Sequence, residues 1–336
     1  MSIKICSFNV KNLADGEGRD IERIAKIIND NHFDIVCLQE VLQEGKILSG
    51  ITVKELSGQA KAYDRSLKSK LKGTWDSEWQ QPKLRKNMEA YLGGDKRGEG
   101  YAILWRTDNN KLTLLRDEYG NEIRPRIFSN YDTRIVGSKL RLIRDPLYAR
   151  FKVGNRPAEL RLITTHIIYG KSDAVKDILD YGAMEMRRKE FDMLAGQIYY
   201  RVSEMYKDSY GTSPECTSPY TIMMGDYNLN LGTSLPFTRC FDKKGHVVSE
   251  DDSFFKVTNL QQKKTTLKRD SAELANSYDH FTVDDRAKGR LVSNSCGVVD
   301  AIHKYKKGTD ASEEDAFYTY REKVSDHLPI AISINI

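Results

Sequence analysis

The sequence is poor in cysteine and has no long apolar run. Its five cysteines are odd in number and none belongs to a CxxC pair, which argues against a disulfide framework and against a zinc site. No apolar stretch approaches the roughly 18 residues of a membrane-spanning helix, and the N-terminus lacks the apolar core of a signal peptide. We therefore expect a protein of a reducing compartment, cytoplasmic by default. A secreted or injected enzyme without its leader would have the same sequence.

Internal repeats, low-complexity segments and linkers are also missing. The 336 residues can build one large α/β domain or two ordinary ones, and without a visible boundary we expect a single domain over 1–336. Hydrophobic residues make up 39% of the chain and charged residues 30%, which allows a sizeable core and excludes wholesale disorder. The net charge of +5 permits a polyanionic partner but does not demonstrate one.

Strand and helix patterns alternate from the start of the chain. Residues 3–10 and 33–41 read as strands and the amphipathic segment 20–31 as a helix, which predicts a βαβ opening. Within the charge-rich segment 54–97, residues 61–71 are a predicted helix, and the stretch that follows, up to Gly98, is a predicted loop.

A hairpin is predicted from 100–106 and 111–115, across the polar "TDNN". Later strands are predicted at 145–153, 158–167, 221–224, 278–283, 290–293, 297–302 and 325–336, and a long helix at 173–206.

Apolar strands in this sequence repeatedly end in residues that bind metals or transfer protons. In "YTIMMGDYNLN" (220–230), for example, an apolar run delivers Asp226 and Asn228. Residues in comparable places at strand ends or starts are Asn9, Glu40, Glu99, His166, Asp279, Asp326 and His327. Each has an ordinary interpretation as a turn or a satisfied structural residue. Their number favours a site on a rigid scaffold, because chance turns have no reason to carry so many such groups.

These residue types suit the hydrolysis of a phosphate ester. Carboxylate and amide oxygens are ligands of Mg²⁺, so Asn9, Glu40 and Asp326 are candidate metal ligands, with Mn²⁺ or Ca²⁺ as alternative ions. One histidine can take a proton from water and a second can give one to a leaving oxygen. Each histidine needs a carboxylate that fixes its tautomer, and Glu99 and Asp279 could serve.

Four motifs resemble those of the endonuclease/exonuclease/phosphatase superfamily, in the same order and nearly from end to end. "SFNVKNL" is similar to the first strand with its asparagine, and "DIVCLQEV" to the metal-binding glutamate motif. "MMGDYNLN" is similar to the GDxN motif, and "SDHLPIAI" to the closing SDHxPV motif. The resemblance implies an α/β fold, a four-layer sandwich of two packed mixed β-sheets flanked by helices.

Finer motifs most resemble the deoxyribonuclease I branch. "GEGYAILWR" resembles the strand whose leading glutamate, here Glu99, partners a histidine. "IRDPLYARF" is similar to the segment that places an arginine, here Arg144, at the scissile phosphate. "THIIYGKSDAVKDI" resembles the strand of the second catalytic histidine, here His166. "SYDHFTV" resembles the strand whose aspartate, here Asp279, supports the terminal histidine.

The resemblance implies a role for each residue. His327 with Asp279 would be the general base, and His166 with Glu99 the general acid. Arg144 would bind substrate. The resemblance also implies that Asp226 and Asn228 hold the phosphate and its attacking water.

The chain also departs from this branch. His280 stands where arginine is usual, Leu42 replaces an arginine that enters the minor groove, and Arg97 stands where a tyrosine is expected. We therefore expect duplex recognition to differ. Segments that look like insertions lie around 54–97, 116–143 and 231–275.

The predicted function is a Mg²⁺-dependent phosphodiesterase that hydrolyses DNA, an endonuclease that leaves 5′-phosphates. The segment 61–97 holds ten Lys/Arg against five Asp/Glu and is expected to contact backbone phosphates. Alternatives are a sister phosphoesterase acting on inositol phosphate or sphingolipid, or on RNA. For a membrane surface, Trp75 and Trp79 are the candidate anchors. A binding module without catalysis is the third alternative. Such a module would be expected to have lost His327, Asp226 or Glu40, and all three are present. Protein partners are not predicted.

Overall fold

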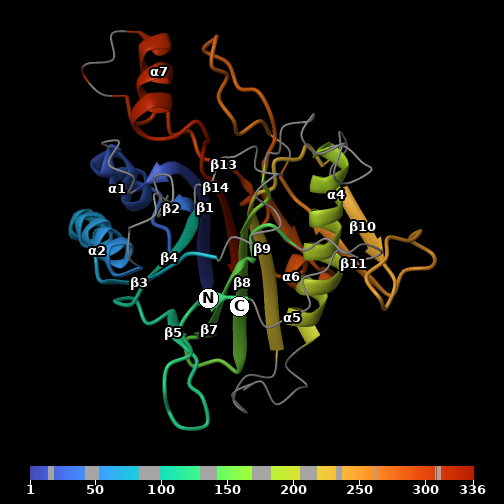
Figure 1. Cartoon of the computed structure of the whole chain (residues 1–336). Coiled ribbons are helices and arrows are strands. Elements are labelled where there is room, and N and C mark those ends of the chain that lie inside the picture. Colours follow the sequence, from blue (N-terminus) through green and yellow to red (C-terminus); the bar gives the residue numbers. More distant parts are fainter. Residues whose placement is uncertain are drawn as a thin grey trace.

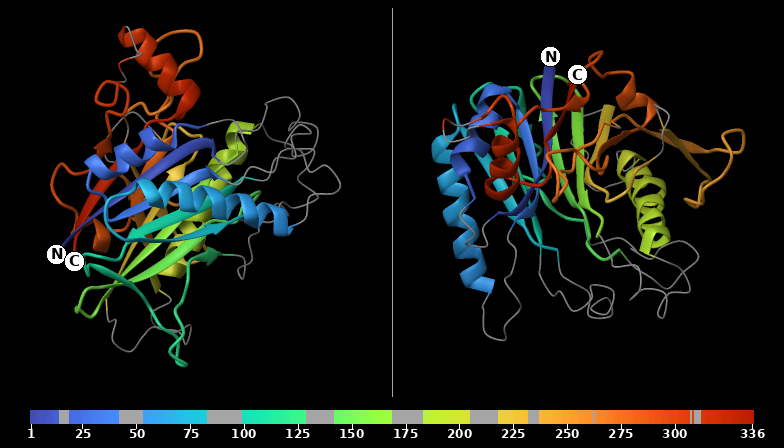
Figure 2. Two further views of the ribbon diagram at one scale, coloured as in Figure 1. Left: turned by 90° about the vertical axis from the view of Figure 1, so that its left-hand side faces the viewer. Right: turned by 90° about the horizontal axis from the view of Figure 1, so that it is seen from above.

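The structure, a computed structural model, describes residues 1–13, 19–41, 53–82, 99–128, 142–168, 183–204, 218–231, 237–261, 263–306, 308 and 312–336. Two mixed β-sheets pack face to face, and helices cover both outer surfaces (Figures 1 and 2). The predicted fold class is therefore confirmed.

The first sheet has the strand order β13-β14-β1-β2-β4-β3. Its strands are β1 (Ser2–Leu13), β2 (Ile35–Val41), β3 (Trp75–Gln80), β4 (Gly100–Arg106), β13 (Gly297–Val298) and β14 (Ile330–Asn335). The second sheet has the order β10-β11-β12-β9-β8-β7-β5, and β6 also pairs with β7. Its strands are β5 (Leu112–Leu114), β6 (Arg126–Ile127), β7 (Leu147–Val153), β8 (Ala158–His166), β9 (Ser218–Asp226), β10 (Phe237–Phe241), β11 (Phe255–Asn259) and β12 (Asp279–Val283).

Helices lie on each side of the pair of sheets. Beside the first sheet are α1 (Ile21–Asp30), α2 (Val53–Lys70) and α7 (Glu313–Lys323). Beside the second are α4 (Ala183–Met193), a π-helical turn η2 (Leu194–Tyr199) and α5 (Tyr200–Glu204), and the short α6 (Asp285–Lys288) follows β12. No helix in the described ranges is both long and apolar enough to cross a membrane.

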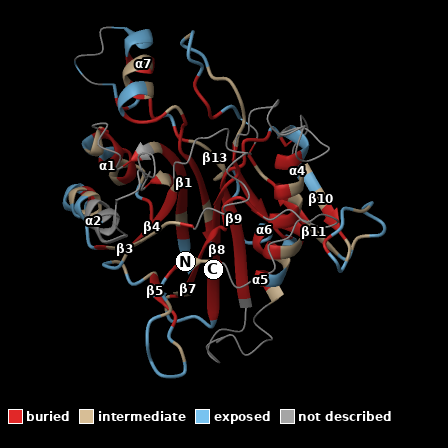
Figure 3. Ribbon diagram, viewed as in Figure 1, coloured by how far each residue is buried: buried red, intermediate tan, exposed pale blue. Residues whose placement is uncertain are grey.

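Three apolar cores follow from the alternation of side chains along the strands. Even-numbered residues of β1, such as Phe8, pack under the helices of the first sheet, and odd-numbered ones, such as Ile5, pack between the sheets. A third core lies between the second sheet and α4. Figure 3 shows the strands as the most buried part of the molecule. The two ends of the chain meet, since Ile336 N donates to Met1 O at 3.0 Å.

Three local predictions were wrong. The strands β4 and β5 do not form a hairpin, because β4 pairs with β2 and β3 while β5 pairs with β7 of the other sheet. Residues 75–80 are a strand and not a loop, with Trp75 and Trp79 against the first core. Residues 290–293 form only an isolated bridge at Leu291. In each case pairing across the sheet decided the outcome, which a local pattern cannot show.

Candidate active site

Strand register brings three of the predicted residues side by side. His166 ends β8, Asp226 ends β9, and Asp279 begins β12. His166 pairs with Asp226 in the parallel ladder, and Asp226 pairs with Asp279 in the antiparallel one. Each lies an even number of residues from side chains that pack between the sheets, so all three face the other sheet.

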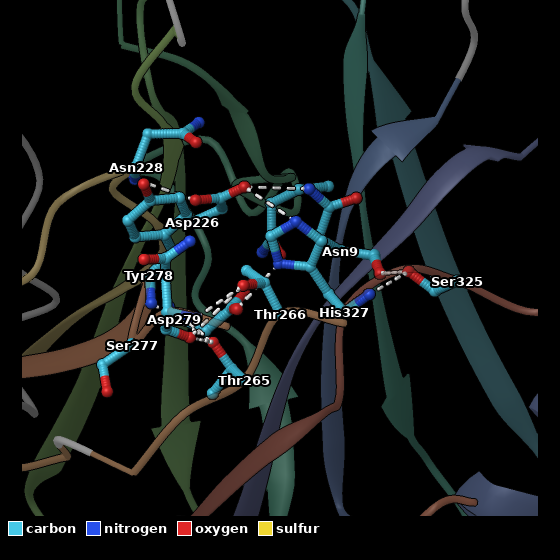
Figure 4. Close-up of polar contacts among 12 residues, drawn as sticks. Asn9, Asp226, Asn228, Thr265, Thr266, Ser277, Tyr278, Asp279, Ser325 and His327 are labelled. Atoms are coloured by element: carbon cyan, nitrogen blue, oxygen red, sulfur yellow. Dashed lines mark hydrogen bonds and ion pairs between the residues drawn. The ribbon is translucent and has the colours of Figure 1, made fainter. Parts of the chain in front are cut away.

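Asn9 reaches this row from the first sheet. It is fully buried on β1, and its Nδ2 donates to Glu40 Oε1 at 2.8 Å and to Asp226 Oδ2 at 3.0 Å. Its Oδ1 accepts from the backbone N of Lys11. The amide therefore bridges carboxylates of the two sheets, as Figure 4 shows for Asp226.

A bulge aims Glu40 at the site. Val36 and Leu38 point to the outer core, and strict alternation would send Glu40 the same way. The register shifts between Gln39 and Val41, and Glu40 has a left-handed φ of 55°. Such a backbone is costly for a non-glycine residue and is typical of functional sites.

Glu99 and Arg144 surround one edge of His166. Nδ1 of His166 lies 2.9 Å from Glu99 Oε2 and 2.8 Å from Arg144 Nη1, and Arg144 Nη1 lies 2.6 Å from the same Glu99 oxygen. An arginine can only donate, so Arg144 can bond to Nδ1 only when that nitrogen carries no proton, whereas a protonated Nδ1 can donate only to Glu99. Glu99 also forms an ion pair with Arg144. Nε2 of His166 then faces the site, 3.6 Å from Asp226 Oδ2.

Charge sets the protonation of this pair. Burial and the charge of Arg144 lower the pKa of His166. The negative charges of Glu99 and Asp226 have the larger effect, so the pKa of His166 is raised overall. Burial raises the pKa of Glu99, but Arg144 and His166 outweigh it and lower the pKa to about 2. Glu99 is thus a fixed negative charge behind a readily protonated histidine.

His327 repeats this arrangement on the other side of Asp226. Its Nδ1 lies 2.8 Å from Asp279 Oδ2, and its Nε2 lies 3.5 Å from Asp226 Oδ2 (Figure 4). Burial lowers the pKa of His327, but the carboxylates of Asp279 and Asp226 raise it well above its usual value. Ser325 fixes the segment, because its Oγ donates to Asn9 O and accepts from His327 N.

Asn228 closes the site next to His166. Its backbone N donates to Asp226 Oδ1 at 2.8 Å, and its Nδ2 donates to Ile167 O and lies 3.3 Å from His166 Nε2. Its φ of 49° is left-handed, a conformation that asparagine tolerates well.

Several supporting residues were not predicted from the sequence. Arg187 of α4 donates to Asn228 O at 2.6 Å, and Glu190 of α4 accepts from Ile143 N beside Arg144. Thr265 Oγ1 accepts from the backbone N of Asp279 at 3.2 Å. None of these residues belongs to a recognisable motif, so no sequence signal pointed to them.

All ten predicted residues lie in the described part of the chain, and nine of them contact another of the set directly. Asp326 is at the margin and pairs with Lys11, whose Nζ lies 3.2 Å from Asp326 Oδ2. His280 is not at the site, since its ring nitrogens lie 2.9 Å from Gln261 O and 2.8 Å from Leu229 O. Leu42 and Arg97 lie outside the described residues, as does the part of the basic segment from 83 to 97.

Glu40 offers a place for a divalent cation. Ligand atoms of Glu40, Glu99 and His166 lie within 4.8 Å of one another. Arg144 already neutralises Glu99, whereas burial and the nearby Glu99 raise the pKa of Glu40 to about 7. The positive charge nearest to Glu40 among the ion pairs of the described residues is that of His166, whose Nε2 lies 3.9 Å from Glu40 Oε1, and it does not offset the burial. Added positive charge next to such a carboxylate is strongly stabilising. The donor set therefore fits an oxygen-binding metal centred on Glu40.

Gly225, just before Asp226, should not tolerate a side chain. Its φ is 143°, and a Cβ there would lie 1.8 Å from the backbone oxygen of Thr165 on the paired strand. We expect Gly225→Ala to lower the free energy of unfolding by about 3 kcal/mol or more, measured by urea denaturation. Gly297→Ala, with nothing within 4 Å of its Cβ, is the matched control. Equal stability of the two variants would contradict the packing described for the β8–β9 pair.

At one edge of the two packed sheets, each of two histidines is paired with a carboxylate. The sequence model of the Endonuclease/Exonuclease/phosphatase family matches residues 6–327. The chain therefore belongs to this family and is a phosphoesterase of that superfamily. None of the curated proteins is similar enough in sequence to match it.

Solved structures of low sequence identity share the fold. An endonuclease/exonuclease/phosphatase family protein from Bacteroides thetaiotaomicron is 15% identical with a TM-score of 0.50, covering 99% of this chain and 98% of that one. The mannosyl-6-phosphatase of the same organism is 16% identical with a TM-score of 0.51, covering 98% of each chain. Truncated TDP2 from Caenorhabditis elegans is 13% identical with a TM-score of 0.50, covering 100% of this chain and 98% of that one.

Proposed function

We propose that the protein is a Mg²⁺-dependent phosphodiesterase of the deoxyribonuclease I branch that cuts DNA internally and leaves 5′-phosphates. One observation carries this proposal. Asp226 Oδ2 lies between two histidine Nε2 atoms, 3.6 Å from His166 and 3.5 Å from His327, and each histidine is backed by its own carboxylate. A phosphate in this place meets a proton acceptor on one side and a proton donor on the other.

The chemistry divides between the two pairs. His327, oriented by Asp279, takes the proton of the attacking water as its oxygen bonds to phosphorus. To act as this base, His327 must first lose the proton that Asp279 and Asp226 favour. His166, oriented by Glu99, gives a proton to the leaving 3′ oxygen as the P–O bond breaks. Arg144 and Asn228 hold non-bridging oxygens of the phosphate, and the 5′ oxygen keeps the phosphoryl group.

Glu40 would hold the cation. Asn9 is hydrogen-bonded to Glu40 through Nδ2, and the charge of Asp326 contributes to the raised pKa of Glu40, so both are candidates to support the cation. A cation there supplies Lewis-acid stabilisation of the charge that builds on the phosphoryl oxygens. Oxygen donors suit Mg²⁺, and Mn²⁺ or Ca²⁺ take the same ligands.

The contact of Glu99 with His166 supports a nuclease over the sister phosphoesterases, because this pairing is the one that the nuclease resemblance implies. A membrane substrate has less support. Trp75 is buried, and Trp79 packs against the first core and donates from Nε1 to Asp64 Oδ1, so both side chains serve the fold.

Supercoiled plasmid tests the function directly. We expect nicking by the purified protein with Mg²⁺, none with EDTA, and none by a His166→Ala/His327→Ala double variant. Nicking that survives in the double variant would place the activity elsewhere. RNA, an inositol phosphate, sphingomyelin and a sugar phosphate serve as parallel substrates, and a preference for one of them over DNA would contradict the nuclease assignment.

A further inference from the structure

Residues 263–277 form a hairpin that we name the basic arm. Its two strands are tied by Ala275 N to Thr266 O at 2.7 Å and by Lys268 N to Glu273 O at 2.9 Å, and Leu267 bridges Leu274. In Figure 1 the arm, in orange, extends beyond the ends of the strands, on the same side of the molecule as α7. All but its last two residues fall within the segment 231–275 that looked like an insertion in the sequence.

The base of the arm rests on both strands that carry the His327–Asp279 pair. Thr265 Oγ1 accepts from Asp279 N at 3.2 Å, and Thr265 O accepts from Leu328 N at 2.8 Å. One residue on, Thr266 forms a β-bridge with His327. Figure 4 shows Thr265 and Thr266 beside the pair. The arm is therefore a direct continuation of the catalytic site.

The arm carries more positive than negative charge. Its cations are Lys263, Lys264, Lys268 and Arg269, all exposed, and its acids are Asp270 and Glu273. Lys268 pairs with Glu273 across the hairpin. The ion pairs among the described residues include none for Lys263, Lys264 or Arg269.

We infer that the basic arm binds the phosphate backbone of a nucleic-acid substrate on one side of the scissile phosphate, an inference that rests on the proposed nuclease function. Arg269 is three residues beyond Thr266, which at about 3.3 Å per residue places it roughly 10 Å along the arm from His327. One DNA strand carries a phosphate about every 3.4 Å along the helix axis, so this reach spans about three nucleotides.

The chemistry of the arm selects the backbone over the bases. Stacking on unpaired bases requires aromatic side chains, and 263–277 contains none. Flexible lysine and arginine side chains contact phosphates and carry little sequence information. The arm should therefore raise affinity for DNA without setting a sequence preference.

The test compares two pairs of exposed cations, each on a hairpin. Lys263→Ala/Arg269→Ala alters the arm, and Lys243→Ala/Lys244→Ala alters the turn between β10 and β11 as the matched control. Binding to a duplex oligonucleotide is measured with Mg²⁺ on a His166→Ala background, so that the DNA stays intact. We expect the arm variant to bind roughly tenfold more weakly at about 0.1 M salt, with a log–log salt slope flatter by about 1 to 2. The control pair should change affinity by less than about twofold.

The same variants in the active protein separate the possible failures. Loss on DNA should exceed loss on the small diester bis(p-nitrophenyl) phosphate, which is too short to reach the arm. Equal losses on both substrates would mean that the arm acts by holding the His327–Asp279 pair, and would overturn a binding role. An arm variant that binds DNA like the control pair also overturns it, while leaving the nuclease function intact. If the unaltered protein neither binds nor cuts DNA, the proposed function itself fails.

Discussion

His327→Ala should lower the rate of plasmid nicking by about 10³-fold, because it removes the group that takes the proton of the attacking water. His166→Ala should cause a loss of similar size on DNA, where the leaving 3′ oxygen must be protonated. The two variants should differ on bis(p-nitrophenyl) phosphate. Its leaving group is stable as an anion, so His166→Ala should recover most of its activity, and His327→Ala should not. Initial rates with Mg²⁺ at saturating substrate measure both.

This comparison separates the two roles, which lie symmetrically about Asp226. If His327→Ala is the variant that recovers on the activated diester, the acid and the base are exchanged. If both recover equally, neither acts as proposed. His246→Ala is a suitable control, since His246 is exposed and pairs with Asp242 in the turn between β10 and β11.

Glu40→Gln should weaken binding of the cation and stabilise the cation-free protein. We expect the Mg²⁺ concentration for half-maximal nicking to rise at least tenfold, because glutamine lacks the charge that holds the ion. In EDTA the pKa of Glu40 is raised from 4.5 to about 7 by burial and by the neighbouring Glu99. A shift of this size corresponds to about 3 kcal/mol of unfolding free energy when Glu40 is ionised.

The sign of this effect fixes its pH range. The folded protein holds the Glu40 proton more tightly than the unfolded chain does, so its stability falls as pH rises from about 4.5 to about 7 and the penalty is complete above that. Urea denaturation in EDTA at pH 5 and pH 8 measures it. Glu40→Gln should be more stable than the unaltered protein at pH 8 and close to it at pH 5, and Mg²⁺ should stabilise the unaltered protein more. If the stability of Glu40→Gln depends on pH as that of the unaltered protein does, ionisation of Glu40 does not destabilise the fold.

The sequence alone determined which chemically active residues lie at the ends of buried strands. Alternation within each apolar strand is a local property, so His166, Asp226 and Asp279 could be assigned to inward-facing positions of buried strands before any partner was known. The motif order then implied the two-sheet fold, which the structure confirms.

Tertiary structure alone decided the rest. A one-residue bulge turns the side chain of Glu40 away from the outer core and toward the site, and no local sequence pattern predicts this bulge. Arg187 and Thr265 contact backbone atoms of Asn228 and Asp279, respectively. Every residue type has these backbone atoms, so the contacts leave no motif in the sequence. The sequence also did not predict which sheet contains β5. A turn specifies a change of chain direction, but only the packing of distant strands specifies the pairing partner.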